Sequence, residues 1–302
     1  MNKLTTSIIA LGALGLATAG VQAGHHEAGE KPANEPLVIG AEDGGTSGLS
    51  LDDVLTGAHR SDKNKARDAF RNPAETLAFF GLEPDMTVVE IWPGGGWYME
   101  VIAPYVAADG AYIAAGFDRS AESDYVKRAT QAMIDKVEAN PELYGQVTVT
   151  ELSREKFDIA PPESADMILT FRNVHNWMDG SENVHRTFAA LYKALKPGGI
   201  LGVVEHRASD AEEQDPKAAS GYVREDYVIM VAEAAGFELV DRSDLNANPK
   251  DTRDHPKGVW TLPPSFRLGD EDREKYQAIG ESDRMTLKFR KPATGGMAAV
   301  SE

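Results

Sequence analysis

One segment constrains the fold more than any other, an apolar strand that runs directly into a cluster of glycines. Residues 87–92 read Thr-Val-Val-Glu-Ile-Trp and are apolar toward both sides, which is typical of a strand buried in a parallel sheet. Pro93 and three glycines follow, and apolar residues return to helical spacing over residues 97–106. A buried strand, a glycine-rich turn and a helix in this order predict an α/β fold.

The rest of the chain continues the alternation of helix and strand. Residues 51–80 carry apolar side chains at helical intervals, with Pro73 opening a second helix and Gly81 ending it. Further strands are predicted at residues 111–117, 147–152, 165–171, 200–205, 237–241 and 284–289, and further helices at residues 126–137, 184–195 and 222–235. This order predicts one α/β domain whose mostly parallel sheet is covered on both faces. The last strand is expected to be antiparallel and to lie at the edge.

Composition narrows the chemistry. The 302 residues are 42% hydrophobic, which is enough to bury a core and too apolar for an intrinsically disordered chain. Lys and Arg total 31 against 48 Asp and Glu, a net charge of −17, so no broad basic surface for nucleic acid is expected. The absence of cysteine excludes disulfides, thiol nucleophiles and cysteine–zinc sites. The chemistry must therefore come from other polar side chains, backbone amides or a bound cofactor.

The first residues resemble an export signal. Residues 1–23 combine Lys3, an apolar stretch over residues 8–19 and the small-residue pattern that ends at Ala23. We expect cleavage after Ala23 and a periplasmic protein with no stable membrane anchor. The alternative, an uncleaved anchor, needs about 20 consecutive apolar residues, and this stretch is shorter and interrupted by glycines.

Two segments outside the domain are predicted to lack regular structure. Residues 24–50 are expected to form a flexible leader, because they are rich in Gly, Pro and Glu and have no apolar periodicity. Its adjacent His25 and His26 lack a third ligand for a metal ion. Residues 293–302 are expected to form a C-terminal tail, so the predicted domain covers residues 51–292.

The ligand site is expected beyond the carboxyl ends of the parallel strands, where ligands bind in folds of this kind. Gly94, Gly95 and Gly96 follow the first strand, and glycines let the backbone turn sharply and come close to a ligand. Asp118 ends the second strand, where a carboxylate is able to accept both hydrogen bonds of a ribose diol. Its alternative role is that of a turn former.

Five segments form an ordered set of motifs, at residues 88–96, 116–118, 166–175, 191–201 and 234–240. The most discriminating pair is Leu-Lys-Pro-Gly-Gly before an apolar strand and Ala-Gly-Phe further along the chain. Together, over about residues 70–292, they resemble the class I S-adenosylmethionine-dependent methyltransferases. The resemblance implies a Rossmann-like sandwich with a mostly parallel seven-stranded sheet and an antiparallel last strand. More narrowly, the chain looks like a bacterial group of exported predicted methyltransferases.

The resemblance implies S-adenosylmethionine as cofactor and assigns residues around the first two strands to it. Glu90 matches the acidic residue that helps to hold the amino-acid end of the cofactor. Gly94 and Gly96, with Gly95 between them, match the glycines that leave room for the cofactor. Asp118 matches the residue that binds the ribose.

Further along the chain the resemblance implies contacts to the adenine and to the reacting end of the cofactor. Glu151 or Leu152 lies where an acidic residue often meets the adenine amino group. Arg172 and Asn173 follow the fourth strand, where cofactor and methyl acceptor meet. Trp92 departs from the pattern, because it replaces the first glycine of the loop. Its indole is expected either to pack over the cofactor or to fill part of its space.

Methyl transfer mainly requires alignment of the acceptor and, where necessary, removal of its proton. His175, Glu205 and His206 lie at the ends of the fourth and fifth strands. Imidazole titrates near neutrality, so either histidine is a candidate general base, oriented by Glu205. The alternative is that the three residues only cap the sheet. A two-histidine, one-carboxylate metal site is not expected, because adjacent residues of an extended strand point to opposite faces.

Residues 246–281 form a long connection, and long connections in compact domains tend to be functional. The aromatic and proline-rich residues 260–266 are expected to lie over the pocket as a lid; the alternative is a surface flap. With Tyr222 and Tyr227 near the start of the preceding helix, an aromatic-lined acceptor site is expected.

Two functions from different classes follow from these observations. The first is an exported S-adenosylmethionine-dependent methyltransferase that acts on a small molecule or a periplasmic component. The second is a ligand-binding module, or a different enzyme, built on the same fold. Trp92 favours the second function, and so does the compartment, because the cofactor is made in the cytoplasm.

Overall fold

The computed structural model describes residues 35–41 and 48–293. The predicted signal peptide, His25 and His26, most of the predicted leader, and the C-terminal tail from residue 294 lie outside the described residues. In the part of the chain that is described, no helix is long and apolar enough to cross a membrane.

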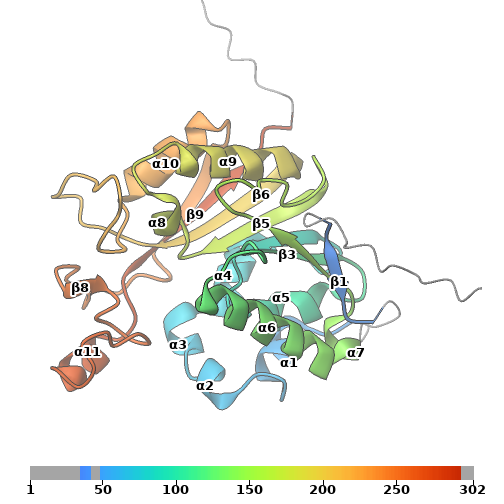
Figure 1. Ribbon diagram of the computed structural model, residues 1–302, viewed down its shortest axis with the longest axis horizontal. Coiled ribbons are helices and arrows are strands. Elements are labelled where there is room, and N and C mark those ends of the chain that lie inside the picture. Colours follow the sequence, from blue (N-terminus) through green and yellow to red (C-terminus); the bar gives the residue numbers. More distant parts are fainter. Residues whose placement is uncertain (1–34, 42–47, 294–302) are drawn as a thin grey trace, which may run out of the picture. The chain divides into compact units, whose positions relative to one another are not determined.

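A single mixed sheet organises the domain (Figure 1). The strands are β1 (Leu37–Ile39), β2 (Thr87–Ile91), β3 (Ala111–Gly116), β4 (Val147–Glu151), β5 (Ala165–Phe171), β6 (Leu195–His206), β7 (Glu238–Ser243), β8 (Pro256–Val259) and β9 (Arg284–Arg290). Eight of them follow the order β1-β4-β3-β2-β5-β6-β9-β7. Strands β2 to β6 pair in parallel, whereas β1 and β9 run antiparallel to their neighbours. The strand order reverses between β3 and β5, on either side of β2.

Helices cover both faces of this sheet (Figure 1). They are α1 (Leu51–Thr56), α2 (Asp62–Lys65), α3 (Asp68–Arg71), α4 (Pro73–Phe80), α5 (Met99–Val106), α6 (Asp124–Ala139), α7 (Pro141–Tyr144), α8 (Val174–Trp177), α9 (Asn183–Ala194), α10 (Glu225–Ala234) and α11 (Arg273–Ile279). One apolar cluster joins Val89 and Ile91 of β2 to α9 and α10. The other joins Val88 to α1, α4, α5 and α6. Both faces of the central strand are buried, which explains its continuous apolar sequence.

Local signals in the sequence set several helix ends. Ser50 accepts a hydrogen bond from the backbone N–H of Asp53, whose carboxylate accepts from the Ser50 backbone in return, and this capping box starts α1. Ser123 caps α6 by accepting a hydrogen bond from the backbone N–H of Val126 with its hydroxyl. Pro73 occupies the first turn of α4, and Gly81, with φ of 83°, ends it. The start of α1 and both ends of α4 fall where the sequence predicts them, whereas α6 begins two residues before its predicted start.

The α/β fold is confirmed, and three details of the prediction are wrong. The sheet has an eighth strand, β1, which lies in the predicted leader and pairs Leu37 with Val149. The last strand, β9, is antiparallel as expected, but it lies between β6 and β7 rather than at the edge. Strand β6 begins at Leu195, so the Lys-Pro-Gly-Gly turn falls inside it, at a shift in its register with β5.

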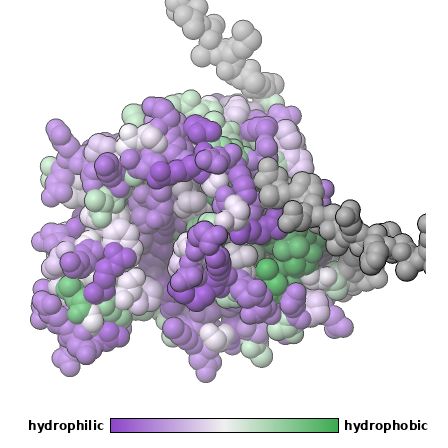
Figure 2. Space-filling model, in the orientation of Figure 1, coloured by the Kyte–Doolittle hydropathy of each residue, from purple (hydrophilic) through white to green (hydrophobic). Residues whose placement is uncertain are grey.

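Figure 2 shows a largely hydrophilic surface that is hollowed between the segment with β8 and α11 and the N-terminal helices. The clearest hydrophobic patch in this view lies at β1, where Val38 is 50% exposed. The hollow leads to the carboxyl ends of the parallel strands, where the predicted site residues lie.

Candidate active site

A cavity of about 720 Å³ lies at the carboxyl ends of β2, β5 and β6. It is lined by the loop after β2, by residues that follow β5, by His206, and by the long connection before β9. Its lining includes Arg67, Arg71, Trp92, Gly94, Gly95, Trp97, Phe171, Arg172, Asn173, His175, His206, Trp260, Arg267, Glu281 and Ser282.

A smaller cavity of about 210 Å³ adjoins the large one. Its lining includes Asp118, Leu152 and Trp177, and it shares Trp92 and Phe117 with the large cavity. The two cavities therefore meet at Trp92. Their position matches the predicted ligand site at the ends of β2 and β3, beside the point where the strand order reverses.

Trp92 adopts a backbone conformation that is more usual for glycine. Its φ is 47°, in the left-handed region that favours glycine. The indole Nε1 donates to the backbone oxygen of Leu152 at 2.9 Å, and its ring lies 4.9 Å from the Phe117 ring and 6.0 Å from the Trp177 ring. The side chain is thus held at the boundary between the two cavities, both of which it lines.

The next glycines leave open space toward the large cavity. A Cβ on Gly95 would meet nothing within 4 Å, and one on Gly94 would meet only the Tyr125 hydroxyl at 3.9 Å. Gly96 differs, because it does not line either cavity and a Cβ there would lie 2.9 Å from the Met99 side chain. Gly94 and Gly95 therefore provide a surface for a ligand, whereas Gly96, with φ of 75°, turns the chain into α5.

Asp118 lies at the small cavity with one of its carboxylate oxygens in use. Oδ1 accepts from the Ser120 backbone N–H, from the Ser120 hydroxyl and from Lys156 Nζ, at 2.9, 2.6 and 2.7 Å. Among the described residues Oδ2 has no hydrogen-bond partner. Burial alone would raise the pKa of Asp118, but the bonds from Lys156 and Ser120 outweigh it and lower the pKa. A ribose hydroxyl therefore has one free, charged oxygen to bind rather than two.

Glu151 is not brought to either of these cavities. Its Oε1 accepts from the backbone N–H and Nε of Arg119, at 2.7 and 2.9 Å, and its Oε2 accepts from Lys156 at 2.8 Å. It lines a separate cavity of about 140 Å³. Of the two positions that the sequence leaves open, only Leu152 lines the small cavity. The adenine role of Glu151 is thus not supported.

Glu90 is also absent from the lining of the two adjoining cavities. It is buried on the face of β2 that packs on α5, and its Oε2 accepts from the Tyr112 hydroxyl at 2.6 Å. Burial raises its pKa to about 7, although the Tyr112 hydroxyl and nearby cations act in the opposite direction. A direct contact between Glu90 and a cofactor is not what this arrangement provides.

Asn173 and Arg172 follow β5 and both line the large cavity. The Asn173 amide donates to the backbone oxygen of Ile91 at 2.8 Å and thereby ties the end of β5 to the end of β2. Arg172 has φ of 63°, and its Nη1 is buried with no hydrogen-bond partner in the described residues. Asn173 therefore positions the end of β5, whereas Arg172 brings to the cavity a buried N–H donor without an acceptor.

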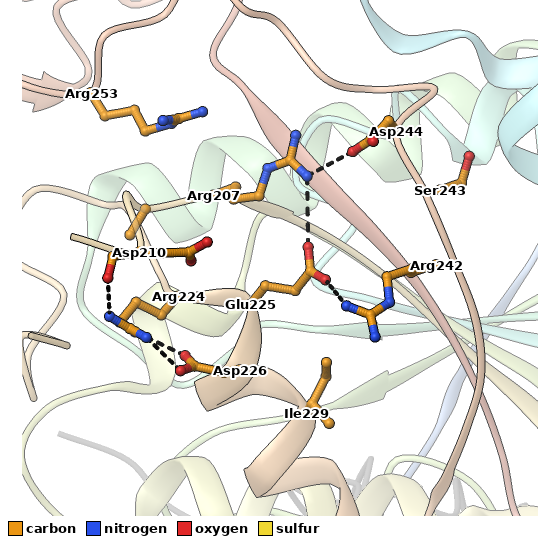
Figure 3. A pocket seen from close by; sticks show the side chains of 11 residues that line it. Arg207, Asp210, Arg224, Glu225, Asp226, Ile229, Arg242, Ser243, Asp244 and Arg253 are labelled. Atoms are coloured by element: carbon orange, nitrogen blue, oxygen red, sulfur yellow. Dashed lines mark hydrogen bonds and ion pairs between the residues drawn. The ribbon is translucent and has the colours of Figure 1, made fainter. Parts of the chain in front are cut away.

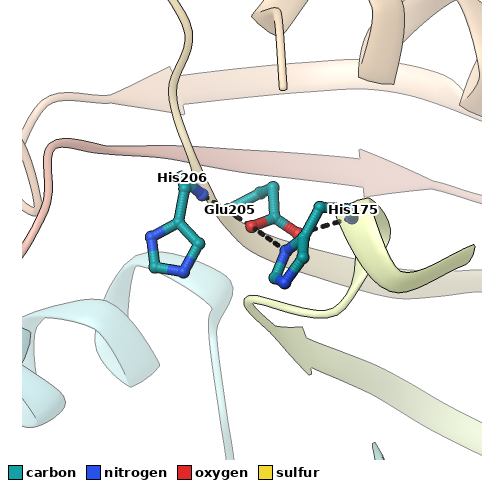
Figure 4. Close-up of side chains that lie close together, drawn as sticks. All are labelled: His175, Glu205 and His206. Atoms are coloured by element: carbon teal, nitrogen blue, oxygen red, sulfur yellow. Dashed lines mark hydrogen bonds and ion pairs between the residues drawn. The ribbon is translucent and has the colours of Figure 1, made fainter. Parts of the chain in front are cut away.

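His175, Glu205 and His206 come together as the sequence suggests (Figure 4). The Glu205 side chain is fully buried, and Oε1 lies 3.0 Å from His175 Nδ1. Glu205 Oε2 accepts from the backbone N–H of His175 at 3.2 Å, and Oε1 accepts from the backbone N–H of His206 at 2.7 Å. The His206 ring lies 5.4 Å from the His175 ring, and its Nδ1 is 2.5 Å from the Ser282 hydroxyl. Burial, His175 and nearby arginines lower the pKa of His206 well below its usual value.

The three side chains offer donor atoms within 4.8 Å of one another, so distance alone does not exclude a metal ion. The expectation that adjacent residues of a strand keep Glu205 and His206 apart is wrong, because β6 ends at His206. The surrounding charge nevertheless opposes a cation. Arg172, Arg284 and Arg71 are close enough to His206 to contribute to its lowered pKa.

Sequence patterns do not identify the arginines on the opposite wall of the large cavity. Arg67 and Arg71, at the two ends of α3, reach Glu281 with their Nε atoms at 2.7 and 3.3 Å. Arg71 also lies over the Trp97 ring at 4.4 Å, and its Nη1 is buried without a partner in the described residues. More than two hundred positions separate these arginines from Glu281 in the sequence, so no local motif could have revealed the pairing.

The long connection before β9 contributes Trp260, Pro263 and Pro264 to the large cavity. The Trp260 ring lies 6.0 Å from the His175 ring. Tyr222 and Tyr227 do not line the cavity, and the Tyr222 hydroxyl donates to Asp251 instead. The aromatic side chains that line the cavity include Trp97, Phe171 and Trp260, the last from the segment that was expected to lie over the pocket.

Another cavity of similar size, about 670 Å³, lies beside α10 and β7 (Figure 3). Its lining is rich in arginine, but the carboxylates there pair with these side chains. Arg207 pairs with Glu225 and Asp244, and Arg224 pairs with Asp226. Because its charges compensate one another, this cavity is a weaker candidate for a ligand site than the one beside His175.

Comparisons with known proteins define the fold. No family model matches the chain, and no curated protein matches it. Solved structures do match. A SAM-dependent methyltransferase from Aquifex aeolicus is 15% identical, with 81% of this chain and 100% of that chain covered and a TM-score of 0.50. The [4+2]-cyclase SpnF is 18% identical, with 79% and 86% covered and a TM-score of 0.52.

The chain thus has the fold of the class I S-adenosylmethionine-dependent methyltransferases. S-adenosylmethionine, which the sequence predicts as cofactor, is the cofactor named for the Aquifex protein. At these identities the likeness concerns the fold, and the reaction has to be argued from the site.

Proposed function

We propose that the protein is an S-adenosylmethionine-dependent methyltransferase that acts on a small molecule. The observation that carries the proposal is the pair of adjoining cavities at the ends of the parallel strands. One contains a charged oxygen suited to a ribose, at Asp118, and the other contains a histidine held by a buried carboxylate. A small acceptor is favoured over nucleic acid because the chain carries a net charge of −17.

The residues around the cavities fit the cofactor. Asp118 Oδ2 would accept from the ribose, and Leu152 and Phe117 would flank the adenine in the small cavity. The exposed backbone of Gly94 and Gly95 would lie beside the rest of the cofactor. When bound, S-adenosylmethionine supplies an electrophilic methyl group, so that the protein has only to align the acceptor and manage its proton.

His175 is the proposed general base. The Glu205 carboxylate accepts from the backbone N–H groups of His175 and His206 and lies beside His175 Nδ1. Because a carboxylate only accepts, His175 Nδ1 carries the proton. The lone pair then resides on Nε2, which has no hydrogen-bond partner among the described residues. His175 lines the large cavity, where this nitrogen would take a proton from an acceptor. Glu205 acts through His175 as a positioning residue.

Calorimetry tests the proposal directly. The purified protein should bind S-adenosylmethionine and S-adenosylhomocysteine, and the two affinities should be similar if only the adenosine and amino-acid parts are recognised. Absence of binding for both ligands at millimolar concentration would refute the proposal. A screen with labelled methyl donor against periplasmic extract would then identify acceptors, and His175→Gln should abolish transfer to them while leaving cofactor affinity unchanged.

Trp92 supports a second candidate, a ligand-binding module or a different enzyme on the same fold. Its indole packs against Phe117 and Trp177 at the boundary of the two cavities, where a glycine would leave more room for a cofactor. The matching structure described as a [4+2]-cyclase also means that this fold is not tied to methyl transfer. Trp92→Gly distinguishes the two candidates. Binding of S-adenosylhomocysteine by the variant but not by the wild type would favour the second.

We further propose that the protein is exported to the periplasm and belongs to the bacterial group of exported predicted methyltransferases. The basic start, apolar stretch and small residues of positions 1–23 support this proposal. N-terminal sequencing of the protein from a periplasmic fraction should begin at Gly24. Recovery of the intact N-terminus in the cytoplasm would contradict it.

A further inference from the structure

The large cavity holds more positive charge than its own residues compensate. Arg67, Arg71, Arg172 and Arg267 line it, and Glu281 is its only lining carboxylate among the described residues. Burial alone would raise the pKa of Glu281, but Arg71, Arg284, Arg67 and Arg172 outweigh burial and hold it at about 2. One carboxylate therefore serves several guanidinium groups.

Two of these arginines have buried nitrogens without partners. Arg71 is 2% exposed, and its Nη1 has no acceptor among the described residues. Arg172 Nη1 is also buried without an acceptor, and the Arg172 side chain makes no hydrogen bond within the described residues. The two groups are close enough for the charge of Arg172 to contribute, after burial, to the lowered pKa of Arg71. Buried donors of this kind are rare unless a ligand or water supplies the acceptor.

The net charge of the cofactor does not compensate these arginines. S-adenosylmethionine carries one carboxylate, but it also carries an ammonium and a sulfonium, so its net charge is positive. Binding it would add to the excess of positive charge in the cavity. A second anion in the same cavity would compensate them, and in a methyltransferase the molecule that shares the cavity with the cofactor is the acceptor.

We propose that the acceptor carries a carboxylate or phosphate group, and that Arg71 and Arg172 bind this group beside His175. Guanidinium groups match both anions through paired N–H donors. Trp97 and Phe171 provide an apolar wall next to the arginines, so the acceptor combines an anionic group with an apolar part. The anion site stands on the cavity itself, whereas its assignment to the acceptor rests on the proposed function.

Titration with inorganic phosphate and with acetate, followed by tryptophan fluorescence, tests the site. Trp97 lies against Arg71 and should report occupancy. The Arg172 side chain makes no hydrogen bond within the described residues, so Arg172→Gln removes none. This variant should weaken phosphate or acetate binding about tenfold to a hundredfold. Arg242→Gln is the matched control, because Arg242 lines the other cavity and pairs with Glu225. It should leave the affinity unchanged.

Three results would overturn the proposal. The first is no binding of either anion at tens of millimolar, and the second is equal weakening in the Arg172→Gln and Arg242→Gln variants. The third concerns the source of the anion. If saturating S-adenosylhomocysteine displaces phosphate, and Arg172→Gln weakens S-adenosylhomocysteine but not 5′-methylthioadenosine, the arginines bind the carboxylate of the cofactor instead.

The proposed function and this inference fail in different experiments. Lack of S-adenosylhomocysteine binding refutes the methyltransferase, and the phosphate and acetate titrations still decide the anion site. Binding of S-adenosylhomocysteine without anion binding refutes only the inference. Simultaneous binding of phosphate and S-adenosylhomocysteine, with loss of phosphate alone in Arg172→Gln, supports both.

Discussion

The buried carboxyl of Glu90 makes stability depend on pH in a way that can be measured. Its ordinary pKa of 4.5 rises to about 7 in the folded chain. A raised carboxyl pKa favours the folded state below the ordinary value, and this contribution is lost as the pH rises through about 7. From about pH 5 to about pH 8 the loss amounts to about 2–3 kcal/mol.

Glu90→Gln removes the charge and keeps an oxygen for the Tyr112 hydroxyl. The difference in unfolding free energy between the variant and the wild type should therefore be about 2–3 kcal/mol more favourable to the variant at pH 8 than at pH 5. Urea unfolding followed by tryptophan fluorescence measures this change at the two pH values. Any constant effect of the amide cancels, because only the difference between the pH values is used.

Two further variants check the reasoning on Glu90. Glu75→Gln removes an exposed carboxylate from α4 and should show no such change with pH. Tyr112→Phe removes the hydroxyl that stabilises charged Glu90, so its loss of stability between the two pH values should exceed that of the wild type. If the unfolding free energy of Glu90→Gln changes between the two pH values as much as that of the wild type, Glu90 is not the group with the raised pKa.

Three other outcomes follow from the site. Asp118→Asn should weaken S-adenosylhomocysteine binding by about 1.5–3 kcal/mol in calorimetry, through one charge-assisted hydrogen bond; an unchanged affinity would remove the ribose role. Glu281→Gln should lower the unfolding free energy by about 3–5 kcal/mol in urea, because it leaves Arg71 and Arg67 without their carboxylate. The wild-type contribution of Glu281 should be present above pH 4.5 and be lost as the pH falls toward about 2. Zn²⁺ should bind wild type and His206→Gln equally in calorimetry, and a weaker variant would establish a metal site.

The sequence predicted the parts of the fold that depend on local pattern. Apolar runs and caps place β2, β3, α5 and α9 close to their observed bounds, because both faces of a parallel strand and one face of a helix must be apolar. Strand β1 was missed, since three residues in a polar segment carry no periodic signal. The place of β9 between β6 and β7 depends on long-range pairing, which no local pattern specifies.

The site residues also fall into those that local pattern predicts and those that depend on long-range contacts. His175, Glu205 and His206 could be grouped because residues at the ends of neighbouring strands meet at one edge of the sheet. Glu151 was assigned to the adenine, since its position was known but the direction of its side chain was not. Arg71 could not be found, because its importance depends on Glu281 and Arg172, which reach it from distant parts of the chain.

Strand β1 has a consequence for how the protein can be handled. It pairs with β4 along an edge that would otherwise expose unpaired N–H and C=O groups, and the backbone oxygen of Glu35 accepts from Arg119 at 2.9 Å beside it. Such open edges promote association between copies of a chain. Removing residues 24–50 as a dispensable leader should therefore yield a protein that aggregates, whereas a version that begins at Gly24 keeps the edge covered.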